Sequence, residues 1–286
     1  MTDQHQHQDR ERGREEGRTL ASTAPAVTAA DGRSRGDRRL LRAAARWSAA
    51  LLVFAGVGTG TAYGIAAMDR GDVPGLATES DGRWDYPRLV LPPLPADRPR
   101  PFTRGNRHHI HHADLRRLLL PAPAGSEVEG GLAGGWVDES QYVSQYAPEH
   151  RPALRQALAD YAVRHVAARG WRMPDGTTCR IYLLRFSTAD LATEFSQEEI
   201  GAGLSPDAAL TAAPETWLDE SWQWDDVVPH ITLHVYDERG SRGPEHTRQA
   251  YILAGDTVAL VVQSRKGSAA AVPFRQTVLL QAQLLG

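Results

Sequence analysis

The hydrophobic and polar positions divide the chain into one long uncharged run and several shorter periodic segments. Residues 47–68 contain no Asp, Glu, Lys, Arg or His, and Arg46 and Asp69 flank the run. A bilayer core about 30 Å thick needs roughly 20 residues of helix, so the run predicts one transmembrane helix. Its N-terminal flank is rich in arginine: Arg33, Arg35, Arg38, Arg39, Arg42 and Arg46. The positive-inside rule then places the N-terminus in the cytoplasm and the C-terminal part outside the plasma membrane.

Two export signals are alternatives to a permanent signal anchor. A cleaved signal peptide would use Gly64 and Ala66 as the small residues before the cut, but a charged leader of 46 residues is long for that pattern. Arg38 and Arg39 also suggest a twin-arginine signal, which the residues after them match only loosely. The sequence therefore favours an uncleaved anchor.

Three glycines inside the run are spaced four residues apart, at Gly56, Gly60 and Gly64. A helix face without side chains allows a second helix to approach closely, which suggests a homodimer. Glycine is also common in membrane helices that have no such role. Both interpretations stay open.

Composition indicates four parts along the chain. Residues 1–46 are polar and lack apolar periodicity, so we expect a disordered cytoplasmic tail. The transmembrane helix follows at residues 47–68. Residues 69–113 contain seven prolines, which oppose helix, and are predicted to form a Pro/His-rich spacer. Residues 114–286 are predicted to fold as the extracytoplasmic domain.

The periodicity within residues 114–286 changes between helix and strand. Apolar positions recur at helical spacing from Pro152 to His165 and again after Pro273, and Ser187 is a suitable cap for a short helix. The turn sequence Pro174-Asp175-Gly176 predicts a hairpin. Strands are expected at 171–173, 177–186, 230–236, 247–253 and 257–264, with a tight turn at 254–256. Together these elements predict an α+β fold, in which an antiparallel sheet is packed by amphipathic helices.

Charge and cysteine content narrow the class of protein. The chain has 32 basic and 35 acidic residues, of which the first 68 contain 10 and 7, so the remainder carries 22 and 28. This acidic excess argues against a nucleic-acid partner. The single cysteine rules out an internal disulfide. Cys179 alternates with Thr177, Ile181 and Leu183, a pattern that favours a buried, inert thiol.

Four histidines lie close together, at His108, His109, His111 and His112. Neutral imidazoles are good ligands for zinc, copper or nickel, so weak metal capture is one hypothesis. The cluster lies in the predicted spacer among arginines, with Asp114 as the nearby carboxylate. This context favours a solvated histidine-rich tract, and no cofactor is predicted.

Residues 217–226 combine indoles with carboxylates: Trp217, Trp222, Trp224, Asp219, Glu220, Asp225 and Asp226. Exposed indoles stack on sugar rings and carboxylates accept sugar hydroxyls, so an envelope glycan site is a hypothesis. Packing of this loop onto the sheet is the favoured alternative. Paired carboxylates also occur in glycosidases, but short loop spacing does not establish the separation which that chemistry requires.

Two segments, residues 169–178 and 255–267, resemble stretches of uncharacterised single-pass membrane proteins of actinobacteria. The resemblance covers roughly residues 114–286 and implies no assigned activity. The architecture is also similar to extracytoplasmic sensor domains of actinobacterial receptor kinases, although residues 1–46 hold no kinase domain and the disulfides common in such sensors are missing.

Common enzyme motifs are absent from the sequence, including the nucleophile elbow, the phosphate-binding loop, the dinucleotide fingerprint and the zinc-protease helix. The sequence therefore favours a non-catalytic, membrane-anchored domain that binds an envelope glycan, a small ligand or a protein partner. A cell-envelope hydrolase with an unrecognised site and a single-pass signalling protein are the alternatives.

Overall fold

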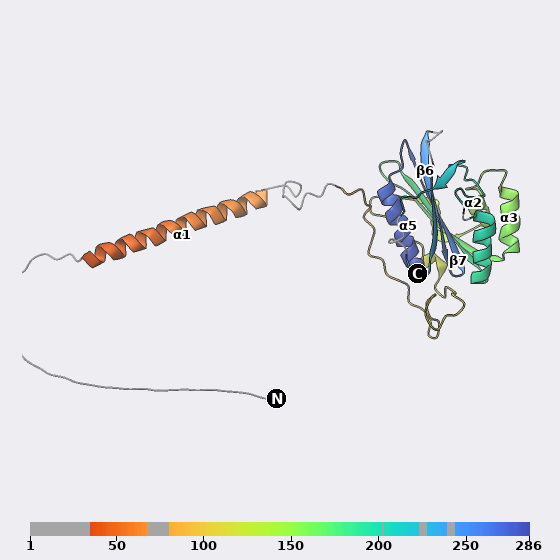
Figure 1. Cartoon of the computed structure of the whole chain (residues 1–286), viewed down its shortest axis with the longest axis horizontal. Coiled ribbons are helices and arrows are strands. Elements are labelled where there is room, and N and C mark those ends of the chain that lie inside the picture. The colour runs from red at the N-terminus through yellow and green to blue at the C-terminus, as the bar shows by residue number, and fades with distance from the viewer. Residues whose placement is uncertain (1–34, 68–79, 202, 223–227, 239–243) are drawn as a thin grey trace, which may run out of the picture. The chain divides into compact units, whose positions relative to one another are not determined.

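The computed structural model describes residues 35–67, 80–201, 203–222, 228–238 and 244–286. It divides into two compact units, residues 1–77 and 78–286, which are considered separately here (Figure 1).

The first unit contains one long helix, α1 (Arg35–Ala67). Its stretch Leu40–Thr59 is long and apolar enough to cross a membrane, by length and composition. Residues 35–46, which were expected to be disordered, are the first turns of this helix, so the tail prediction is corrected there. Residues 1–34 and Met68 lie outside the described residues. Gly56, Gly60 and Gly64 all belong to α1, and no atom lies within 4 Å of a Cβ placed at Gly56.

The second unit is built on a seven-stranded sheet with the strand order β1-β2-β3-β7-β6-β5-β4, in which all neighbouring strands are antiparallel. The strands are β1 (Glu127–Val137), β2 (Val163–Arg172), β3 (Thr178–Phe186), β4 (Thr216–Leu218), β5 (Thr232–Glu238), β6 (Glu245–Ala254) and β7 (Thr257–Lys266). This confirms the predicted antiparallel α+β class.

Helices cover both faces of the sheet, as Figure 1 shows for α5 on one side and α2 and α3 on the other. The helices are α2 (Glu139–Val143), α3 (Arg151–Asp160), α4 (Ala189–Phe195) and α5 (Ala271–Leu285). The sheet has a hydrophobic core on each face, and successive side chains of β3 alternate between these two cores. Cys179, Ile181 and Leu183 pack on the α5 face, whereas Tyr182, Leu184 and Phe186 pack on the opposite face. A strand buried on both faces needs apolar side chains at nearly every position.

The predicted hairpin is confirmed as β2–β3. In its turn, Met173 N donates to Thr177 O (2.8 Å) and Thr177 N donates to the Asp175 carboxylate (2.9 Å). The three later strands and the C-terminal helix are also confirmed. The Pro152 helix is shorter than expected, because it ends at Asp160 and the chain enters β2 after Ala162 (φ 53°). The cap of α4 is Thr188 rather than Ser187.

The expected start of the folded domain at residue 114 is corrected by the packing of the Pro/His-rich segment. Trp84 and Tyr86 stack edge-on against the buried Trp171, at 6.3 Å between ring centroids. Trp84 N also donates to the side chain of Gln276 (2.8 Å) on α5. Proline opposes helix but not burial, so an extended chain can still cover one face of the sheet. Residues 69–79 of the predicted spacer lie outside the described residues.

Cys179 has no exposed surface, which confirms the expected buried thiol. Burial raises the pKa of this thiol well above its usual range, because a thiolate would be poorly solvated there. Cys179 is therefore unsuited to nucleophilic chemistry.

Candidate functional site

A groove lined by four arginines lies beside the β1–β2 edge of the sheet. We call it the arginine groove. Its volume is about 430 Å³, and its lining consists of Pro87, Arg88, Leu89, Val90, Arg116, Arg117, Leu119, Pro121, Arg169 and Leu284. The lining therefore combines cationic heads with aliphatic surface and contains no carboxylate.

Two of the arginines are positioned by a short 3-10 helix, Leu115–Arg117, whose cap is Asp114. Leu115 is completely buried, so the next two side chains project to the surface. The Asp114 carboxylate accepts from Arg116 N (3.0 Å) and from the Arg116 guanidinium (2.6 Å). These contacts lower the pKa of Asp114. The Arg116 guanidinium also lies over the Trp136 ring, 5.0 Å from its centroid, so its orientation is defined on two sides.

Arg169 comes from β2 and forms the inner wall of the groove. Its Nη1 donates to Leu119 O (3.1 Å) and Leu120 O (2.9 Å), which fixes the guanidinium without neutralising it. Gly134 on the neighbouring strand makes room for this side chain, because a Cβ there would lie 2.2 Å from Arg169 Nη2. Partial burial lowers the pKa of Arg169, yet an arginine remains a cation in proteins.

The charge of the arginine groove is largely uncompensated. Of its four arginines, Arg116 is paired with Asp114. Arg88, Arg117 and Arg169 form no ion pair with any carboxylate within the described residues. Guanidinium groups hold phosphate and carboxylate oxygens through paired N–H donors, so this arrangement is suited to an anionic ligand.

A second open cavity of about 440 Å³ adjoins Trp136 and includes His165 and Arg164 from β2. His165 was expected on the apolar face of a helix. It lies instead on the exposed surface of the strand, with its ring 5.0 Å from that of Trp136. The His165 ring therefore contacts the Trp136 ring at the surface and is not part of the hydrophobic core.

The four predicted histidines do not form one cluster of free imidazoles. His108 and His109 are exposed, and the His109 ring lies against Phe102. His111 is buried, with Nδ1 2.6 Å from Asp256 Oδ1 and Nε2 2.8 Å from Leu285 O. Both of its ring nitrogens are thus occupied. Desolvation is the main cause that lowers the pKa of His112. Across the part of the chain that the structure describes, no group of three or more His, Cys, Asp or Glu side chains is arranged for a metal ion.

The predicted indole and carboxylate site is only partly visible, because Trp224, Asp225 and Asp226 lie outside the described residues. Trp217 is 43% exposed on the edge strand β4. Trp222 packs edge-on against Phe274 of α5, and the Arg275 guanidinium lies 4.9 Å from its ring centroid. The packing of Trp222 is what the loop-anchoring alternative predicts.

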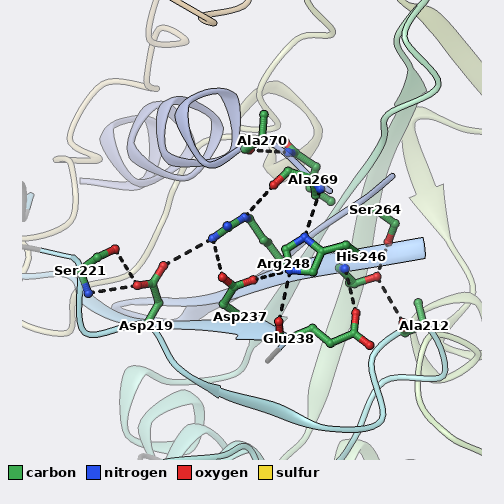
Figure 2. A network of polar contacts seen from close by, with 12 residues as sticks. Ala212, Asp219, Ser221, Asp237, Glu238, His246, Arg248, Ser264, Ala269 and Ala270 are labelled. Atoms are coloured by element: carbon green, nitrogen blue, oxygen red, sulfur yellow. Dashed lines mark hydrogen bonds and ion pairs between the residues drawn. The ribbon is translucent and has the colours of Figure 1, made fainter. Parts of the chain in front are cut away.

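Asp219 belongs to a network of polar contacts between the loop, the sheet and the chain before α5 (Figure 2). Its carboxylate accepts from Ser221 N (3.0 Å) and Ser221 Oγ (2.6 Å) and lies 3.5 Å from Arg248 Nη1. Arg248 also pairs with Asp237 (2.9 Å) and donates to Ala269 O (3.0 Å). These contacts hold Asp219 as a structural carboxylate.

His246 completes the network of Figure 2. Ala269 N donates to its Nδ1 (3.1 Å), which places the ring proton on Nε2, and Nε2 donates to Glu238 O (3.2 Å). Nε2 also lies 3.0 Å from Asp237 Oδ1. With both nitrogens engaged, the imidazole is not placed to serve as a general base.

The arginine groove was missed by sequence reasoning. Its side chains come from four segments that are separated in sequence, and β1, the strand beside it, is glycine-rich and shows no alternation. The adjacent pair Arg116-Arg117 is the local signal of this site in the sequence.

Comparison with known proteins adds little to this geometry. No family model matches the chain, and no curated protein matches it. Among solved structures, the crystal structure of the extracellular domain of PknH from Mycobacterium tuberculosis matches 45% of this chain and 68% of that chain, with 12% identity and a TM-score of 0.30.

Proposed function

We propose that the chain is a membrane-anchored protein whose C-terminal domain lies outside the cytoplasm and binds an anionic ligand in the arginine groove, without catalysing a reaction. The apolar helix α1 with its arginine-rich flank supports the anchor and its orientation. The resemblance of residues 169–178 and 255–267 to single-pass actinobacterial proteins agrees with this proposal.

One observation carries the ligand class. Three arginines without carboxylate partners line one groove, in a chain whose residues after 68 carry more acidic than basic side chains. Like-charged guanidinium groups repel one another, and a bound oxyanion removes that repulsion. The ligand is therefore a phosphate- or carboxylate-bearing molecule of the envelope.

The full chain in neutral detergent should bind tripolyphosphate, a soluble probe of phosphate recognition. We expect Arg117→Gln and Arg88→Gln each to weaken binding by about tenfold, because each removes a charged hydrogen-bond donor. Affinity should also fall as salt is added, since these groups are solvent-exposed. Isothermal titration calorimetry measures both effects.

Arg155 provides the matched control. It is an exposed arginine on α3, the helix on the opposite face of the sheet. Arg155→Gln should leave tripolyphosphate binding unchanged. Equal losses for Arg155→Gln and Arg117→Gln would show non-specific charge attraction and would rule out the arginine groove as the site.

A further inference from the structure

We propose that the anionic ligand of the arginine groove is the phosphate headgroup of a lipid in the membrane that anchors the chain, so that the groove docks the domain onto the bilayer. This inference rests on the proposed function, because it names the ligand of the same site. It adds a membrane-docked state of the domain.

The first argument is the mixed chemistry of the groove. Val90 is 75% exposed beside Arg88 and Leu89 is partly exposed next to it, whereas Leu284, which also lines the groove, is 6% exposed. A soluble inorganic anion makes no use of exposed aliphatic surface. A membrane interface matches both features, because arginine heads contact lipid phosphates while apolar side chains enter the acyl boundary.

The second argument is the position of the groove along the chain. Only fifteen residues, 69–83, separate the end of the predicted span from Trp84. Even fully extended, fifteen residues reach about 50 Å, so the predicted tether is short. The groove begins at Pro87, so the tether keeps it at a high effective concentration of headgroups.

The third argument is the contrast between the groove and the rest of the domain. Because the residues after 68 carry an acidic excess, an anionic bilayer repels most of this surface. Docking through the arginine groove presents cationic side chains to the lipid and avoids that repulsion. The α3 face, which bears Ala153 and Arg155 on the opposite side of the sheet, should point away from the bilayer.

A depth measurement in nanodiscs tests this orientation. The full chain carries a fluorophore on Val90→Cys or, as the control, on Ala153→Cys, and the discs contain headgroup-spin-labelled lipid. Buried Cys179 does not react with the dye. With phosphatidylglycerol in the discs, the Val90→Cys probe should be quenched and the Ala153→Cys probe should not. In discs of phosphatidylcholine alone, both probes should stay bright.

The arginines should control the docked population. Arg88→Gln combined with Arg117→Gln should lower the docking equilibrium about 30-fold, whereas Arg155→Gln should leave it unchanged. Equal quenching of the two probes, or quenching that does not depend on phosphatidylglycerol, would overturn the inference. If tripolyphosphate binds in detergent but the Val90→Cys probe is never quenched, the proposed anion site stands and the lipid assignment fails. If tripolyphosphate does not bind and the Val90→Cys probe is not quenched, both the anion site and the lipid assignment fail.

Discussion

Asp256→Ala should destabilise the folded domain by about 3–5 kcal/mol, the usual cost of removing one partner from a buried ion pair. The Asp256 side chain is 2% exposed. Its carboxylate accepts from His111 N (3.1 Å) and Thr257 Oγ1 (3.1 Å) and lies 3.4 Å from Arg185 Nε. Alanine would leave these donors without an acceptor in a site from which water is excluded. Denaturant unfolding of the full chain in detergent, followed by near-UV circular dichroism, measures the loss.

Asp81→Ala is the control for this variant. Asp81 also pairs with an arginine, Arg83, but both side chains are about two thirds exposed, at 66% and 68%. An exposed pair contributes at most about 1 kcal/mol, so this variant should unfold almost as the native chain does. If Asp256→Ala were as mild as Asp81→Ala, the buried contacts of Asp256 would not stabilise the folded domain.

Gly255→Ala should cost about 3 kcal/mol or more, because the substitution meets both strain and a collision. Gly255 has φ +52°, a region that disfavours side chains, and a Cβ there would lie 2.1 Å from His109 O. That oxygen is backbone and accepts a hydrogen bond from Asp256 N (3.3 Å), so it cannot move without breaking the contact. The same denaturant titration reports this change.

Gly176→Ala separates the collision from the strain. Gly176 occupies the β2–β3 turn with φ +85°, and a Cβ there would have no atom within 4 Å. This variant should lose about 1–2 kcal/mol, the cost of a left-handed backbone alone. Equal losses at positions 176 and 255 would mean that the His109 segment does not press on the β6–β7 turn.

Asp256 and Gly255 both lie against the segment that contains His109 and His111, whose packing sequence reasoning did not predict. The prolines of residues 84–101 correctly excluded helix, but burial of Trp84, Tyr86 and Leu91 depends on a sheet face that forms only when distant strands pair. Likewise, nothing local indicates that His111 meets Asp256. Buried polar contacts between segments so far apart cannot be read from spacing.

The periodic elements were predictable because their patterns are local. Short runs rich in apolar and β-branched residues at 177–186 and 257–264, with turns at Asp175-Gly176 and Gly255-Asp256, were sufficient to identify the central strands. The Pro152 helix was extended too far, because Val163 and Val166 continue the apolar spacing while the backbone changes to β2 after Ala162. β1 was missed because Gly130, Gly131, Gly134 and Gly135 conceal any alternation.

The candidate site was less predictable than the fold. The predicted indole and carboxylate segment includes Trp222 and Asp219, which are engaged in packing and in the network of Figure 2. The arginine groove, by contrast, arises from the packing of residues 87–90 against the 3-10 helix and β2. Such a site depends on tertiary contacts rather than on a motif.

The most direct test determines on which side of the membrane the domain lies. Because Cys179 is buried, a maleimide should not label the native chain. One accessible cysteine can then be introduced, either at Ala153 on α3 or at Thr23 in the N-terminal segment. In intact spheroplasts, a membrane-impermeant maleimide should label Ala153→Cys at once and Thr23→Cys only after permeabilisation. Labelling of Thr23→Cys from outside, with Ala153→Cys protected until the membrane is opened, would contradict an extracytoplasmic domain.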